Sequence, residues 1–159
     1  MLENKLKTLD GNSISYEFQY SDSEHNRVSS IEADNEYIQI TKEFGFEAGH
    51  YVPDHGGRCK YVHGHSYKLF VTVGGYLNEQ GMVMDFQVLS EIVKVLIDKY
   101  DHGFLNDYFE LPTAEIMASY LRKAIQNQLP DNVYCDEVKL YETAKCCAIS
   151  KRRGVGIGA

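Results

Sequence analysis

The chain has 159 residues, enough for one domain with a substantial core, and 23 acidic against 16 basic residues give a formal net charge of −7. That charge provides no basic surface for nucleic acid, and neither a run of about 18 apolar residues nor an N-terminal signal peptide is found, so we expect no nucleic-acid or membrane partner. Four cysteines, including the adjacent Cys146 and Cys147, make a poor disulfide framework, and we expect a reduced, cytoplasmic setting.

Residues 1–36 precede the main pattern as an N-terminal extension. Within it, the stretch 13–20 alternates strictly between apolar and polar residues, which predicts a half-buried strand. Turn-forming residues follow at 21–26. We expect an added strand or hairpin that extends or covers a sheet edge, whose function the sequence does not indicate.

Two histidine-bearing strands are predicted on either side of the loop 51–62. The first runs through residues 37–50 and ends at His50. The second follows the loop, and its β-branched and aromatic residues continue through 66–76. Because alternate residues of a strand share a face, His63 and His65 point the same way. If the two strands pair as antiparallel neighbours, three imidazoles converge, which is the ligand set of a catalytic zinc site with one open position.

The residues alone leave the metal site open. A single histidine is more often a core or surface residue than a ligand, and a His-x-His pair is a weak signal. Cys59 lies four residues before His63, at the end of a glycine-rich loop. A free cysteine is usually a small buried hydrophobe, but a nearby cation or metal lowers the thiol pKa and suits it to proton transfer.

Two amphipathic helices are predicted next. Asp85 is placed to cap the first, and it should end near Tyr100. Its apolar face comprises Phe86, Leu89, Val93, Leu96 and Tyr100. Thr113 is placed to cap the second, with Glu115 favoured in its first turn by the helix dipole. That helix has an apolar face of Met117, Tyr120, Leu121, Ala124 and Ile125, and it ends before Pro130.

Three further carboxylate and histidine residues have ordinary structural explanations. Asp101 and His102 follow the first helix, where a C-terminal cap interacting with the helix dipole is the simplest interpretation. Glu142 continues the apolar face of a strand through 138–142, although a strand end that reaches solvent explains it as well. A last strand is expected at 146–150, followed by a frayed tail at 151–159.

The predicted order is strand, strand, helix, helix, strand, strand. This order gives an α+β domain, with an antiparallel four-stranded sheet and both helices on one face.

Six motifs between residues 38 and 150 carry a resemblance to a known family. In order they are Phe46-x-Ala48-x-His50, Cys59-x-x-x-His63-Gly64-His65-x-Tyr67, Gly81-Met82-Val83-Met84-Asp85-Phe86, Asp101-His102-x-x-Leu105-Asn106, Pro112-Thr113-Ala114-Glu115 and Glu142-Thr143. The sequence resembles the 6-pyruvoyl-tetrahydropterin synthase superfamily, and within it the 6-carboxytetrahydropterin synthase branch of queuosine biosynthesis. The spacing between Cys59 and His63 resembles that branch, because animal members carry a longer insert there.

The resemblance implies a tunnelling fold (T-fold) for residues 37–150, in which the sheets of identical subunits join into a barrel with active sites at the interfaces. It implies that His50, His63 and His65 bind Zn²⁺. It also implies that Cys59 acts with Asp101 and His102 as a proton relay across a subunit interface. Glu142 resembles the pterin anchor, with Thr113 and Glu115 near the pterin pocket.

The implied activity is conversion of 7,8-dihydroneopterin triphosphate to 6-carboxytetrahydropterin, acetaldehyde and triphosphate. One alternative is a 6-pyruvoyl-tetrahydropterin synthase, which only eliminates triphosphate. The other is a non-catalytic binding module stabilised by zinc, in which Cys59 serves as the fourth ligand.

Overall fold

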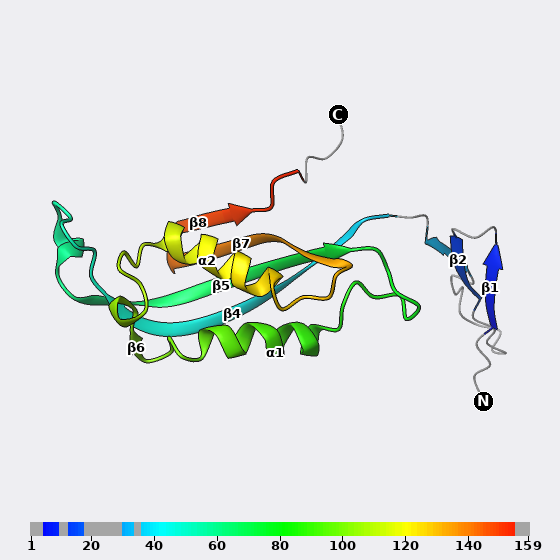
Figure 1. Cartoon of the computed structure of the whole chain (residues 1–159), viewed down its shortest axis with the longest axis horizontal. Coiled ribbons are helices and arrows are strands. Elements are labelled where there is room, and N and C mark those ends of the chain that lie inside the picture. Colours follow the sequence, from blue (N-terminus) through cyan, green and yellow to red (C-terminus); the bar gives the residue numbers. More distant parts are fainter. Residues whose placement is uncertain (1–4, 10–12, 18–29, 34–35, 155–159) are drawn as a thin grey trace.

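The computed structural model describes residues 5–9, 13–17, 30–33 and 36–154. Its main body is a five-stranded sheet in the order β6-β4-β5-β7-β8. The strands are β4 (Ile38–His50), β5 (His63–Gly75), β6 (Gly103–Phe104), β7 (Val133–Thr143) and β8 (Cys146–Lys151). Helices α1 (Phe86–Ile97) and α2 (Ala114–Gln126) cover one face of this sheet, as the α+β prediction requires (Figure 1).

The sheet differs from the prediction by one short strand. The four long strands pair antiparallel as expected, but β6 adds a fifth strand parallel to β4, with Gly103 opposite Ala48 and Phe104 opposite Gly49. A strand of two residues has no alternation to detect, so the sequence pattern could not show it. It fixes the segment after Tyr100 against the end of β4.

The two histidine-bearing strands pair as predicted. β4 and β5 run antiparallel, with His50 directly opposite His63 and Ala48 opposite His65. β5 starts at His63, three residues earlier than its apolar run indicated. The connecting loop holds a short 3₁₀ helix, η1 (Arg58–Lys60), so Cys59 lies at the centre of a helical turn.

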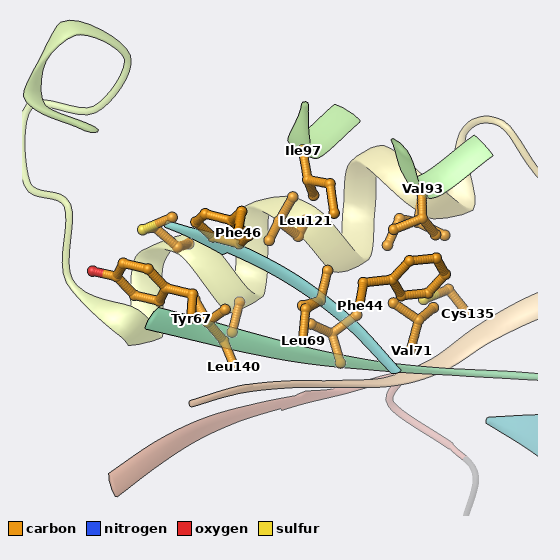
Figure 2. Packing of buried hydrophobic residues seen from close by; sticks show 14 of the residues in the cluster. Phe44, Phe46, Tyr67, Leu69, Val71, Val93, Ile97, Leu121, Cys135 and Leu140 are labelled. Carbon is orange, nitrogen blue, oxygen red and sulfur yellow. The ribbon is translucent and has the colours of Figure 1, made fainter. Parts of the chain in front are cut away.

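The core lies between the sheet and the two helices. Figure 2 shows Phe44 and Phe46 of β4 and Leu69 and Val71 of β5 packing against Val93, Ile97 and Leu121 of the helices. Both caps form as predicted: Asp85 accepts a hydrogen bond from the backbone N–H of Gln87, and Thr113 accepts one from Ile116.

The helices differ from the sequence prediction in three respects. The first helix ends at Ile97 instead of Tyr100, although Tyr100 remains buried in the core. Phe86 and Tyr120, which the sequence pattern places on apolar faces, are 48% and 42% exposed. Ile97 takes the inward position at the end of α1, because the last turn of a 3.6-residue helix brings it below Val93.

A buried carboxylate fastens the opposite end of the sheet. Asp136 of β7 is 3% exposed and accepts hydrogen bonds from Tyr37 Oη at 2.8 Å, Gln39 Nε2 at 2.8 Å and Arg152 Nε at 3.1 Å. Burial and Asp136 raise the pKa of Tyr37 to about 12. Lys151 is the last residue of β8, so the ordered chain continues past the predicted start of the tail.

The N-terminal extension forms a sheet of its own. β1 (Lys5–Leu9), β2 (Ser13–Glu17) and β3 (Ser30–Ala33) pair antiparallel in that order. β2 is the first part of the predicted strand 13–20, and residues 18–20 lie outside the described residues. Over the described ranges this sheet is not hydrogen-bonded to the main sheet, so the predicted extension of a sheet edge is not observed. In the described part of the chain, neither helix has the length and apolarity needed to cross a membrane.

Candidate metal centre and active site

Three histidines converge at the end of the β4–β5 pair. One ring nitrogen each of His50, His63 and His65 lies within 4.8 Å of the other two. The ring centroids are separated by 4.5 Å, 5.2 Å and 5.0 Å for the pairs 50–63, 50–65 and 63–65. These spacings allow one ion to reach all three rings at ordinary zinc–nitrogen distances of about 2.0–2.1 Å.

Backbone carbonyls orient two of the three rings. His50 Nδ1 lies 2.8 Å from the carbonyl oxygen of Pro112, and His63 Nδ1 lies 2.8 Å from that of Tyr61. Because a carbonyl only accepts, each Nδ1 carries the proton and each Nε2 keeps its lone pair. A second hydrogen bond of this kind is the usual support of a metal-binding histidine.

The environment of His65 favours its neutral form. Burial lowers its pKa below the ordinary value of 6.5, and His50 and His63 act in the same direction while Glu142 opposes them. His50 is 2% exposed, and its Nε2 has no hydrogen-bond partner among the described residues. A buried nitrogen without a partner is costly unless a ligand satisfies it. The cluster therefore has the tautomers, spacing and unsatisfied atom of a metal site.

Glu142 turns toward this cluster from β7. Its Oε1 atom lies 3.9 Å from His50 Nε2, and the side chain is 26% exposed. Tyr141 pairs with Cys147 and Thr143 with the next residue of β8, Cys146, so Glu142 is the extra residue of an irregularity in the ladder. A bulge of this kind redirects a side chain. The carboxylate therefore faces the histidines, instead of reaching freely into solvent as the simpler sequence interpretation proposed.

Cys59 lies on the loop side of the cluster. It lines an open hollow of about 440 Å³ together with His63, Arg58, Tyr61 and Val62. Its side chain is partly buried, and its carbonyl accepts a hydrogen bond from Val52 N that closes the loop. Cys59, on the 3₁₀ turn η1, thus shares a hollow with His63, one residue of the histidine cluster.

Asp101 and His102 form a pair at a different place. His102 Nδ1 lies 3.1 Å from Asp101 Oδ2, and His102 adopts a left-handed backbone conformation with φ of 56°. Neither residue caps α1, because the helix ends at Ile97 and its C-cap is Asp98. Glu47 holds the pair through its backbone: its N–H donates to Asp101 Oδ1 at 2.8 Å, and its carbonyl accepts from His102 N–H at 2.6 Å.

The pair is not connected to Cys59 within one chain. His102 lines a hollow with Glu47, His65 and Ser66, whereas Cys59 lines another hollow with His63. Among the residues the structure describes, no hydrogen bond or ion pair links Asp101 or His102 to Cys59. The backbone bonds from Glu47 lower the pKa of Asp101, and its interaction with His102 adds to that effect.

The two remaining candidates lie at the start of α2. Thr113 caps the helix and directly follows Pro112, whose carbonyl contacts His50. Glu115 is exposed in the first turn. The structure therefore places Thr113 beside the cluster through its neighbour, whereas Glu115 has no such connection among the described residues.

Sequence reasoning missed three groups at this site. The carbonyls of Tyr61 and Pro112 are backbone atoms, and no residue type predicts them. The third is the side chain of Tyr67, whose hydroxyl is buried without a hydrogen-bond partner in the described structure. The alternation of β5 could have indicated it, because residues 63, 65 and 67 share one face.

Comparison with known proteins gives consistent matches. The model of the 6-pyruvoyl tetrahydropterin synthase family matches residues 39–153. A Haemophilus influenzae protein named 6-carboxy-5,6,7,8-tetrahydropterin synthase is 45% identical over 75 residues, which are 44% of this chain and 53% of that protein. This chain thus spans about half the length of that relative. A Rickettsia conorii protein of the same name is 30% identical over 133 residues, covering 69% of this chain and 96% of that protein.

The fold has a counterpart among solved structures. The Caenorhabditis elegans 6-pyruvoyl tetrahydropterin synthase superposes with a TM-score of 0.66 at 23% identity, covering 74% of this chain and 96% of that one. At this identity the similarity establishes the architecture, and it agrees with the predicted T-fold.

Proposed function

Since this chain belongs to the 6-pyruvoyl tetrahydropterin synthase family, we propose that it is a zinc-dependent 6-carboxytetrahydropterin synthase. Its substrates are 7,8-dihydroneopterin triphosphate and water, and its products are 6-carboxytetrahydropterin, acetaldehyde and triphosphate. The names of the two relatives support 6-carboxytetrahydropterin as the product. The observation that carries the proposal is the convergence of three histidine nitrogens within 4.8 Å, with the Glu142 carboxylate beside them.

Zinc fits the donor set. His50, His63 and His65 would hold it through nitrogen atoms, and the partnerless Nε2 of His50 is the atom that most needs such a ligand. Three protein ligands leave a position open for substrate. When bound, the ion supplies Lewis-acid polarisation of the oxygen atoms on the substrate side chain.

The side chains around the metal site carry out proton transfer and bind the pterin ring. Cys59 lines the same hollow as His63, and from there its thiolate removes a proton from a carbon of the substrate side chain. His102, oriented by Asp101, is suited to exchange protons with solvent and with the departing groups near neutral pH. Glu142 accepts hydrogen bonds from the amino group and adjacent N–H of the pterin ring. Thr113 and Glu115 border the same pocket.

Assembly of identical chains brings these groups together. His102 lines a different hollow from Cys59, so a single chain does not complete the relay. In the described structure β8 is an edge strand, and β6 covers only two residues of β4. Exposed edges of this kind invite pairing with another chain. We place the active sites at the interfaces of a barrel-shaped homo-oligomer, with a cytoplasmic role in queuosine biosynthesis.

Mass spectrometry of the products is the direct test. The zinc-loaded protein is incubated with 7,8-dihydroneopterin triphosphate, and 6-carboxytetrahydropterin with acetaldehyde is the expected result. Pyruvoyl-tetrahydropterin without acetaldehyde would assign elimination alone. Unchanged substrate with an assembled, zinc-containing protein would refute both enzyme assignments and favour a binding module.

A further inference from the structure

Tyr67 is the one buried side chain at this site whose polar atom the proposed metal does not explain. The residue is 1% exposed, and its hydroxyl has no hydrogen-bond partner in the described structure. A buried hydroxyl without a partner costs on the order of 1–3 kcal/mol. The proposed metal would satisfy His50 Nε2, the other such atom, but a phenol with its proton is not a usual zinc ligand.

The ring of Tyr67 is held firmly in place. It stacks on Phe46 with ring centroids 4.9 Å apart and planes 11° from parallel. It meets the His65 ring edge-on, with centroids 5.6 Å apart. Figure 2 shows the hydroxyl oxygen directed away from Leu69 and Val71. The direction of β5 makes this the end of the sheet where the histidines lie. The hydroxyl is therefore fixed at the border between core and site.

Glu142 lies close enough to Tyr67 for its charge to act on the phenol. The β5–β7 ladder ends with Lys68 opposite Tyr141, so Tyr67 and Glu142 are the next residues of the two strands beyond that pair. Lys68 and Tyr141 point away from the helices. Because successive residues of a strand point to opposite faces, the neighbouring side chains of Tyr67 and Glu142 lie on the helix-covered face. Directly opposed residues have Cβ atoms about 4.5–5.5 Å apart, within reach of a tyrosine and a carboxylate.

We propose that Tyr67 is a positioning residue whose hydroxyl donates a hydrogen bond to the Glu142 carboxylate in the ligand-bound site. Glu142 Oε1 already lies toward His50, so the tyrosine holds the other oxygen and fixes the plane of the carboxylate. A carboxylate with a fixed plane presents both oxygens to a donor pair such as the amino group and adjacent N–H of a pterin. This inference rests on the proposed function of Glu142 as pterin anchor.

Binding of neopterin, a fluorescent pterin, to zinc-loaded protein tests the proposal without depending on turnover. Tyr67→Phe removes the hydroxyl and keeps the ring stacked on Phe46. We expect an unchanged zinc content and an increase of about tenfold or more in the dissociation constant, as for loss of a hydrogen bond to a charged group. The matched control is Tyr100→Phe, which removes the hydroxyl of an equally buried tyrosine from the same core and should leave neopterin affinity unchanged.

A double-mutant cycle identifies the partner of the hydroxyl. In a Glu142→Gln background, Tyr67→Phe should cost much less affinity than in the wild type, because the charged acceptor has been removed. An equal cost in both backgrounds would show that Tyr67 contacts the ligand itself and would overturn the positioning role. No loss of affinity in Tyr67→Phe would overturn it as well. If the wild type fails to bind neopterin and to consume dihydroneopterin triphosphate, the proposed function has failed instead.

Discussion

His50 Nδ1 lies 2.8 Å from the carbonyl oxygen of Pro112, which joins a proposed metal ligand to the residue immediately before the Thr113 helix cap. The end of β4 and the start of α2 are thus connected at the metal centre. A disturbance of the cap should therefore reach the ligand.

Replacement of Thr113 by alanine should affect stability and metal binding together. Loss of the cap costs about 1 kcal/mol of folding stability. The shift of the Pro112 carbonyl should weaken zinc affinity by roughly tenfold, the lower range for loss of an orienting partner. Asp85→Ala is the matched control, since it removes the equivalent cap from α1, for which the described residues show no hydrogen bond to the histidine cluster. Denaturant unfolding and competition with a zinc chelator measure the two effects, and equal zinc affinity in both variants would contradict the connection.

Substitution of a ligand should release the metal. Purified wild-type protein is expected to hold about one zinc ion per chain, and His65→Ala to hold almost none, because two histidines bind zinc weakly. His55→Ala is the control, since His55 is an exposed loop residue that hydrogen-bonds Gly57 N–H outside the cluster. Elemental analysis of both proteins after dialysis gives the result, and retention of zinc by His65→Ala would remove this histidine from the site.

Cys59→Ala separates catalysis from metal binding. If Cys59 is the catalytic base, the variant should keep its zinc and its thermal stability while turnover falls by at least about 100-fold. If Cys59 were instead the fourth ligand of a structural site, zinc and stability would be lost together. Zinc content, thermal unfolding and product formation, measured on the same preparation, distinguish the two outcomes.

Gly74→Ala should destabilise the end of the sheet far from the metal. A Cβ atom at Gly74 would collide with Asp136 Oδ2 and would lie 2.6 Å from Tyr37 Cε1, inside the buried hydrogen-bond cluster. We expect a loss of about 2–3 kcal/mol, typical of overpacking a core. Gly56→Ala is the control, because a Cβ there would meet nothing within 4 Å. Thermal unfolding compares them, and equal stability would contradict the close packing around Asp136.

The titration of Asp101 should report its attachment to β4. Its pKa is lowered, chiefly by the hydrogen bond from Glu47 N–H, below the ordinary value of 3.8. A lowered folded-state pKa means that the contribution to stability is present above pH 3.8 and is lost as the pH falls through the folded value. Carbon-detected NMR of the carboxyl group measures the midpoint. A midpoint at or above 3.8 would show that the bond to Glu47 does not persist in solution.

The sequence predicted well those features that depend on side-chain type and spacing. The alternation of β4 and β5 and the His-x-His spacing sufficed to bring three imidazoles together, and both helix caps follow from Asp85 and Thr113. What the sequence could not show depends on backbone groups and register. β6 forms through backbone hydrogen bonds, His102 adopts a left-handed conformation, and the irregularity at Glu142 depends on how β7 pairs with β8. The meeting of Asp101 and His102 with Cys59 was implied only by family resemblance, and one chain does not display it.

The long β4–β5 pair separates two specialised regions of the molecule. His50 and His63 lie at one end of the ladder, and Gln39, which contacts Asp136, pairs with Gly74 near the other end. Eleven strand steps separate Gln39 from His50, roughly 35 Å at about 3.3 Å per residue. Free-energy changes at sites so far apart usually add independently. Variation near Asp136 can therefore retune thermal tolerance while the chemistry is conserved, so an engineer or natural selection can adjust one property at a time.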